Sequence, residues 1–240
     1  MKNSKFNISP MTSFVLVLFL AGISSSCGTK SSHKEPDEHA KDSVHNEAAE
    51  DHPHDQSASA TSSGNIMWMP GDKPFDGPLK LVKGGAQKLD ASITTDNGGV
   101  KTLSLTLSGS QVVLLFDGLL ENIGSNLQFK TEEFQGKVVM VHHYIDESNY
   151  DYLSLSNTSM QLGRIENGKD NVLDKKDEKM PVYWAKLTVS AAGEHYKGSL
   201  NDKLVNHGHG ETRPAGRVGL LLEGRGKVML KMMEVIKLTE

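Results

Sequence analysis

Aromatic and polar side chains alternate between residues 150 and 156, where the sequence reads Tyr-Asp-Tyr-Leu-Ser-Leu-Ser. In a strand, successive side chains point to opposite faces, so Tyr150 and Tyr152 would share one face and Leu153 and Leu155 the other. If the leucines enter the core, both rings project outward. A projecting ring can stack on the apolar face of a sugar while its hydroxyl meets the polar rim. The alternative is that the rings pack against neighbouring strands.

Two adjacent histidines, His142 and His143, lie in a run that predicts a strand. Adjacent residues of a regular strand point to opposite faces, so the two imidazoles are not expected to share a metal ion. The residues that alternate with His143 form the more apolar set, which places His142 on the other surface with Met140 and Tyr144. His142 is therefore a candidate for hydrogen bonding to a sugar, and a structural histidine is the alternative.

The densest polar cluster of the folded region is His207, His209 and Glu211. Two imidazoles and a carboxylate within five residues could ligate a divalent metal ion. A solvent-exposed polar loop is the alternative interpretation. No other cofactor is expected.

Motifs that would assign a reaction are absent from the sequence. There is no nucleophile elbow, phosphate-binding loop, dinucleotide motif or paired glycosidase carboxylates on one strand. The net charge of −4 offers no basic surface for nucleic acid, so no nucleic-acid partner is expected.

The first residues have the order of a secretory signal peptide. Lys2 and Lys5 precede an apolar stretch of ten residues, Phe14 to Ile23, and three serines then lead into Cys27. The apolar stretch is shorter than the roughly twenty residues that a spanning helix needs. Small residues before a lone cysteine resemble the lipobox of bacterial lipoproteins.

Residues 1–26 are accordingly interpreted as a lipoprotein signal peptide and Cys27 as the lipidation site. The expected location is the bacterial cell envelope, with the protein held by its N-terminal lipid on the periplasmic or outer-membrane face. The alternative is an ordinary soluble secreted protein. Because Cys27 is the only cysteine, the mature fold is expected to have no disulfides.

Residues 27–64 are rich in Ser, Ala, Asp, Glu and His and contain almost no large aliphatic side chain. Such a composition predicts a disordered His-rich, acidic tether. Its histidines among carboxylates also suit a metal-binding interpretation, although they lack a regular ligand spacing. These five residues are His33, His39, His45, His52 and His54.

Residues 65–240 are predicted to form one all-β domain, because short runs of Val, Leu, Ile and Tyr alternate with Gly, Asn, Asp and Pro. The spacing favours an antiparallel sandwich of the jelly-roll kind. The candidate strands are 101–107, 111–116, 125–131, 136–145, 150–156, 160–166, 182–190, 195–200, 203–207, 216–223 and 227–238. The segments 146–149, 166–168, 200–202 and 223–226 carry turn residues and are predicted hairpin connections.

The order of motifs in the second half resembles a known family. Asp146 to Tyr150 gives "D-x-x-N-Y", Trp184 to Val189 "W-x-x-L-x-V", Asn201 to Leu204 "N-D-x-L" and Gly216 to Leu220 "G-x-V-G-L". This order resembles the concanavalin A-like, laminin-G-like jelly roll, and in particular the 3-keto-disaccharide hydrolase domain family. The resemblance covers roughly residues 125–238 and implies a concanavalin A-like antiparallel β-sandwich.

The leading functional interpretation is carbohydrate binding, with Tyr150, Tyr152, His142 and Arg164 as contacts. One alternative is a glycoside hydrolase of the 3-keto-disaccharide hydrolase type, with a metal near His207, His209 and Glu211. Another is an adhesion module that binds a protein partner. These interpretations rest on analogy of fold, and one fold can host many functions.

Overall fold

A computed structural model of the chain describes residues 64–84 and 89–239. The predictions for the signal peptide, Cys27 and the His-rich tether fall outside the described residues, apart from Gly64. Within the described ranges no helix is long and apolar enough to cross a membrane. Twelve strands make up the regular structure there: β1 Ile66–Trp68, β2 Leu79–Lys83, β3 Leu89–Thr95, β4 Lys101–Phe116, β5 Ile123–Asp146, β6 Asn149–Ser156, β7 Ser159–Glu166, β8 Lys169–Asp177, β9 Ala185–Ala192, β10 His195–Leu200, β11 Lys203–His209 and β12 Arg217–Lys237.

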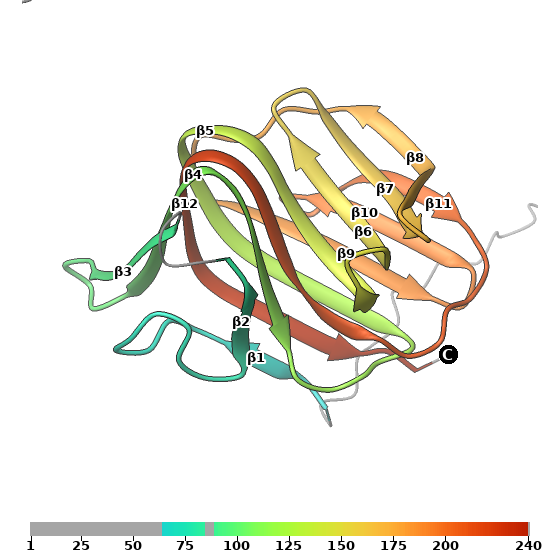
Figure 1. The fold of residues 1–240 in the computed structure, drawn as a ribbon, viewed down its shortest axis with the longest axis horizontal. Helices are drawn as coiled ribbons and strands as arrows, with labels where there is room; N and C mark the ends of the chain where they lie inside the picture. The colour runs from blue at the N-terminus through green and yellow to red at the C-terminus, as the bar shows by residue number, and fades with distance from the viewer. Residues whose placement is uncertain (1–63, 85–88, 240) are drawn as a thin grey trace, which may run out of the picture. The chain divides into compact units, whose positions relative to one another are not determined.

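All the strand pairs are antiparallel, and three long strands, β4, β5 and β12, carry the chain between two layers (Figure 1). In the first layer the order is β2-β4-β12-β5-β6-β7-β8. The second layer has the order β11-β10-β9-β5-β12-β4-β3, with β1 also paired with β12. The all-β antiparallel sandwich predicted from the sequence is confirmed.

The bends in the long strands coincide with breaks predicted from the sequence. Segments 101–107 and 111–116 belong to the one strand β4, 125–131 and 136–145 to β5, and 216–223 and 227–238 to β12. The predicted hairpin at 223–226 is wrong, because Gly224 remains paired with Gly136 of β5 inside the strand. Gly224 and Gly226 have φ angles of 144° and 113°, so the backbone bends and forms a bulge without reversing direction.

The other three predicted turns are confirmed as hairpin connections. They join β5 to β6, β7 to β8, and β10 to β11. In the last two, Asn167, Asn201 and Asp202 have positive φ angles, which Asn and Asp tolerate better than most residues.

The main core lies between the two layers. Its largest fully buried side chains include Trp68, Phe116, Phe129 and Tyr196. A second, smaller apolar cluster lies on the outer face of the first layer and includes Val139, Val141, Leu221, Tyr144 and Tyr152. The first layer is thus apolar on both faces over part of its area, and its outer face is where a ligand could be held.

Candidate functional site

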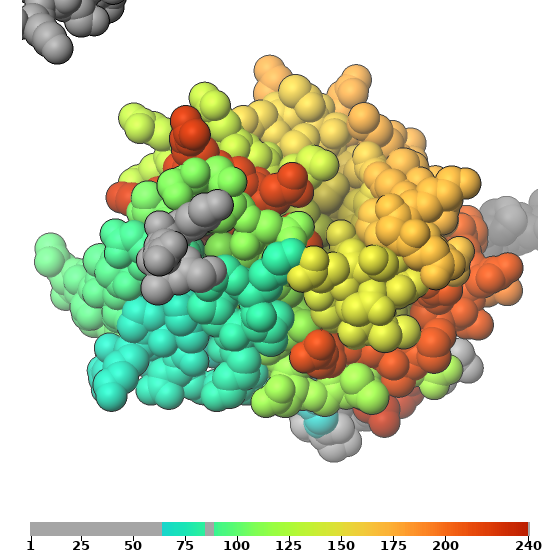
Figure 2. Space-filling view, viewed as in Figure 1, coloured from blue at the N-terminus to red at the C-terminus, as the bar shows by residue number. Residues whose placement is uncertain are grey.

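A groove of about 650 Å³ lies on the outer face of the first layer. Figure 2 shows this part of the surface, hollowed between β5 and β12 on one side and β7 and β8 on the other. The groove has the size of typical small-molecule sites. Its lining comes from five strands and one turn: Gln135, Gly136, Lys137, Val139, Tyr150, Tyr152, Ser154, Ser156, Asn157, Thr158, Ser159, Gln161, Ile165, Asp170, Lys175, Leu221 and Glu223.

Strand β6 supplies the two tyrosines of the groove as the alternation predicts. Tyr150 and Tyr152 line the groove, whereas Leu153 and Leu155 are fully buried in the core between the layers. Tyr150 is partly exposed, and Tyr152 is only 5% exposed. Tyr150 is therefore the ring with surface free to meet a ligand, and Tyr152 forms part of the groove floor.

Tyr152 is held in place by its neighbours in β7 and β8. Its hydroxyl donates to Asp170 Oδ1 over 2.7 Å and accepts from the amide of Gln161. Burial and the adjacent Asp170 raise the pKa of Tyr152 far above its usual value, so the phenol stays neutral. The ring lies across Gly163, its register partner. Glycine is required there, since a Cβ at this position would lie 2.3 Å from the tyrosine hydroxyl oxygen.

Tyr150 lies in the middle of an aromatic row. Its ring stacks on Tyr144 at a centroid distance of 5.7 Å and is tilted against Tyr152 at 6.3 Å. Arg217 lies over the ring of Tyr144, with its guanidinium carbon 5.6 Å from the ring centroid. This row fixes the orientation of the Tyr150 ring before any ligand arrives.

The structure corrects the prediction for His142. The side chain is fully buried between the layers and does not reach the groove. His142 follows the regular alternation of β5 with Val138 and Met140, which face the main core, so the predicted face was wrong. A bulge at His143, whose φ is 49°, then turns this second imidazole inward as well and returns Tyr144 to the outer face. His142 Nδ1 lies 3.1 Å from His143 Nδ1, and the His142 ring stacks on Tyr196 at 6.0 Å.

The structure also places Arg164 away from the groove. Its guanidinium points between the layers and forms two hydrogen bonds to the buried carboxylate of Asp151, at 2.7 and 3.0 Å. The same group donates to the Tyr196 hydroxyl and to the backbone oxygen of Glu211. Arg164 on β7 is the register partner of Asp151 on β6, and register partners point to the same face of a sheet. Its side chain therefore points to the interior, opposite to the face that carries the tyrosines.

Opposing effects set the protonation states of this interior network. Burial alone would raise the pKa of Asp151, but hydrogen bonds from His143 and Arg164 outweigh it and hold that pKa far below its usual value. Burial, with smaller effects of His143 and Arg164, lowers the pKa of His142 to about 3. At neutral pH Asp151 is therefore ionised and His142 is uncharged.

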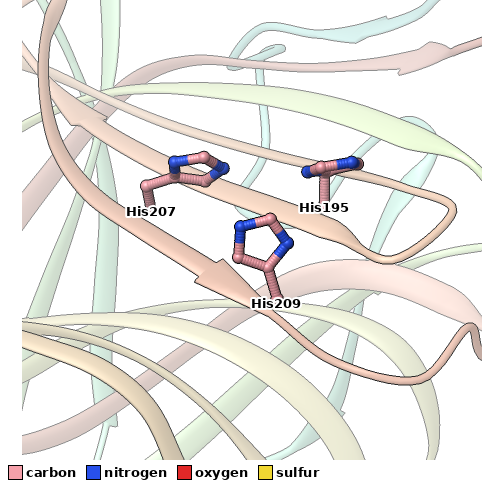
Figure 3. Close-up of side chains that lie close together, drawn as sticks. All are labelled: His195, His207 and His209. Atoms are coloured by element: carbon pink, nitrogen blue, oxygen red, sulfur yellow. The ribbon is translucent and has the colours of Figure 1, made fainter.

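Of the three residues predicted to ligate a metal ion, His207 and His209 lie together in the structure, whereas Glu211 does not join them. His207 and His209 project from the same face of β11, and the ring of His195 in β10 lies beside them (Figure 3). Among the described residues these three exposed imidazoles form one of two clusters that could hold a metal ion, and Glu211 belongs to neither. Glu211 follows the end of β11, so its side chain is not carried by the paired strands.

Sequence reasoning missed His195 because the β10–β11 hairpin contains a bulge. A regular ladder beyond the pair Leu200 and Lys203 would place His195 opposite Gly208. The register shifts between Gly198 and Ser199, and His195 instead pairs with His209. The predicted turn at 200–202 indicated the hairpin correctly, and a regular pairing from that turn would have placed His195 one residue away from His209, its observed partner.

Comparisons with known proteins identify the fold through structure alone. No protein-family model matches the chain, and no curated protein sequence matches it. Among solved structures, the carbohydrate-binding module CBM66 from Bacillus subtilis is similar with 16% identity and a TM-score of 0.50, covering 65% of this chain and 94% of that one.

Two further structures are similar at 10% identity. A prokaryotic β-1,3-1,4-glucanase (lichenase) derived from a mouse hindgut metagenome has a TM-score of 0.51, over 72% of this chain and 99% of that one. A protein of unknown function from Shewanella oneidensis MR-1 has a TM-score of 0.55, over 77% and 93%. With the antiparallel topology, these likenesses show that the chain has the concanavalin-like jelly-roll fold.

Proposed function

We propose that this protein is an exported lipoprotein whose jelly roll binds carbohydrate in the groove over β5 to β8 and β12. The observation that carries the proposal is the partly exposed Tyr150, held in an aromatic row beside polar groove residues. A sugar ring presents an apolar face and a hydroxyl rim, and this combination of groups matches both.

The groove supplies the two kinds of contact from different strands. Apolar contact comes from Tyr150 together with Val139 and Leu221, which belong to the outer apolar cluster. Hydroxyl and amide groups, including Ser154 and Gln161, line the same groove and can exchange hydrogen bonds with sugar hydroxyls. The charged residues of the lining are two lysines and two carboxylates, so the groove has no net charge and suits an uncharged glycan.

The arrangement of carboxylates favours binding over hydrolysis. Asp170 and Glu223 line the groove, but β8 and β12 are four strand positions apart in the first layer. Among the described residues, Asp170 and Glu223 are the only carboxylates of the groove lining and lie on strands separated by β5, β6 and β7, whereas glycosidases bring two carboxyl groups to within about 5–10 Å of each other. Similar solved structures include both a carbohydrate-binding module and a glucanase, so the fold itself permits either activity.

The attachment to a membrane rests on the sequence. The charged start, the short apolar stretch and the lone Cys27 match an exported lipoprotein, with the domain displayed from the cell envelope. A lipid of this kind would hold a glycan-binding domain close to its own cell surface.

The first experiment is a glycan array with the protein, followed by calorimetry on the best ligand. Tyr150→Ala is expected to weaken binding about tenfold or more, equivalent to about 1.4 kcal/mol. Tyr183→Ala is the matched control, because Tyr183 is 60% exposed and lies outside the groove. Equal affinity of the Tyr150 variant and the parent for every bound glycan would place the binding face elsewhere.

Mass spectrometry distinguishes binding from turnover. The protein is incubated with ordinary disaccharides and 3-keto-disaccharides, with and without a chelator. Unchanged sugars are expected for a binding protein. Time-dependent cleavage would replace the proposal with a hydrolase, and no bound glycan at all would favour a protein-binding adhesion module.

A further inference from the structure

Three exposed histidines lie together on the outer face of the second layer, away from the groove. We propose that His195, His207 and His209 form a binding site for a zinc ion, with three imidazole ligands and an open fourth position. The site is independent of carbohydrate binding, because it lies on β10 and β11 and the groove lies on β5 to β8 and β12. No other function of these residues follows from the groove.

The backbone brings the three rings together in a fixed way. His207 and His209 are two residues apart in β11, so they share a face, and His195 of β10 is the register partner of His209. Ring centroids are 4.7 Å apart for His195 and His209, 4.8 Å for His207 and His209, and 6.1 Å for His195 and His207. Figure 3 shows all three rings on the same side of the hairpin.

The spacing of the nitrogen atoms is close to what a metal ion requires. One ring nitrogen from each histidine lies within 4.8 Å of the others. Zinc bound at about 2.0–2.1 Å in a tetrahedral site holds its ligand nitrogens roughly 3.3 Å apart. The three side chains are exposed, so small rotations about their side-chain bonds can close this difference without disturbing the core.

The chemistry of the ligands selects the class of metal. Imidazole suits zinc, copper and nickel, whereas calcium requires six to eight oxygen ligands. Three histidines with an open fourth position are a recognised zinc arrangement. The carboxylate of Glu211 is not part of the cluster, which removes the oxygen ligand on which a calcium site would depend.

The second cluster of possible ligands is less suited to a cation. His142, His143 and Asp151 also lie close together, but they are buried. Arg164 forms two hydrogen bonds to Asp151, and Arg213 Nε lies 3.8 Å from the same carboxylate. These guanidinium groups already neutralise the carboxylate and repel a metal ion. The exposed cluster contains no carboxylate, and Lys197, the register partner of His207, lies on the same face of the hairpin.

A bound ion would join two strands at the edge of the sheet. β11 ends the strand order of the second layer, and an edge strand has a partner on one side only. Zinc held by His195 from β10 and by His207 and His209 from β11 would tie that edge to its neighbour. The expected consequence is greater thermal stability of the metal-loaded protein.

The test uses calorimetric titration of zinc chloride into the full chain, purified with a tag that contains no histidine. A background variant replaces the five tail histidines, His33, His39, His45, His52 and His54, with Asn, so that binding outside the hairpin is removed. The expected result is one site per chain with a Kd below about 0.1 mM. Zinc at about 100 times Kd is expected to raise Tm by about 5–10 °C.

Single replacements in that background locate the ligands. His195→Asn and His207→Asn are each expected to weaken zinc binding at least about tenfold, with Tm in the absence of zinc unchanged. Glu211→Gln is the matched control and should bind as the background does. Full affinity in both histidine variants, or the loss of all binding when only the tail histidines are replaced, would overturn the site.

Discussion

Asp151 and Arg164 face each other as register partners on β6 and β7, and two hydrogen bonds of 2.7 and 3.0 Å join their side chains between the layers. Asp151 is fully buried and Arg164 is 7% exposed. An ion pair in such a place has lost the hydration of both charges, so its contribution depends on both partners being present.

Removing one partner is expected to be far more harmful than removing both. Arg164→Met leaves Asp151 buried with weaker compensation and should lower the free energy of unfolding by about 3–5 kcal/mol. The double variant Asp151→Leu with Arg164→Met should recover most of this loss. Urea denaturation at neutral pH measures both values, and equal loss in the single and double variants would contradict the argument.

The protonation of His142 should make the protein sensitive to mild acid. In the unfolded chain the imidazole binds a proton below its ordinary pKa of 6.5, whereas in the folded protein the pKa is about 3. The stabilisation is thus present above pH 6.5 and is lost as pH falls from 6.5 towards 3, by about 1.4 kcal/mol per pH unit. At about pH 4.5 the expected loss from this one group is about 2–3 kcal/mol.

A variant that cannot titrate isolates this contribution. His142→Leu is uncharged at every pH. The buried Nε2 of His142 has no hydrogen-bond partner, and the contact of its Nδ1 with His143 Nδ1 is lost at both pH values alike. Urea denaturation of both proteins at about pH 7 and about pH 4.5 should show a smaller drop for the variant, by about 2–3 kcal/mol. Parallel pH profiles would show that other groups cause the acid sensitivity.

The close approach of Tyr152 to Gly163 predicts a structural effect on the groove. In Gly163→Ala the new Cβ would lie 2.3 Å from the tyrosine hydroxyl oxygen, so the ring must move off β7. Loss of about 1–3 kcal/mol of stability is expected, together with weaker glycan binding. Combining Gly163→Ala with Tyr152→Leu should restore stability but not binding, as thermal unfolding and calorimetry can show.

The bend in β12 should tolerate no side chain at Gly224. A Cβ there would lie 2.3 Å from the backbone oxygen of Gln135, and the φ of 144° is rarely adopted by other residues. Gly224→Ala is expected to lower stability by more than about 3 kcal/mol. Gly118→Ala is the control: its φ is 109° but no atom lies within 4 Å of the added Cβ, so a loss of about 1–2 kcal/mol is expected.

Replacement of Cys27 tests the proposed membrane attachment. If Cys27 carries the lipid, the parent protein should partition with the membrane fraction of the producing bacterium. Cys27→Ser removes the acceptor thiol and should yield a protein without lipid mass that leaves this fraction. Intact-mass analysis of both proteins gives the measurement, and an unmodified Cys27 in the membrane fraction would count against the interpretation.

The sequence predicted correctly those features that depend on alternation along one strand. In β6 the apolar Leu153 and Leu155 mark the core face, so the outward position of Tyr150 and Tyr152 follows from the pattern. The all-β fold followed in the same way. Strand β8 was missed because it is an edge strand with mostly polar residues, and such a strand has little alternation to detect.

The features that could not be predicted depend on local departures from regular strand geometry. The inward position of His143 depends on its own positive φ, which its residue type does not predict. The face of His142 was misassigned because β5 carries apolar residues on both faces there. His195 reaches His209 only through a shift at Gly198 and Ser199. Gly224 marked a change of direction in the sequence, but whether the strand reverses or bends depends on its partners in β4 and β5.

The pairing of β1 with β12 sets the order in which this domain can be completed. Ile66 pairs with Val235, 169 residues away, so the first strand cannot find its place until nearly the whole domain is available. Contacts between such distant residues slow folding, because a long loop must close before any contact forms. For an exported chain, as proposed here, late completion of the fold would favour the unfolded state in which a polypeptide can be threaded across a membrane.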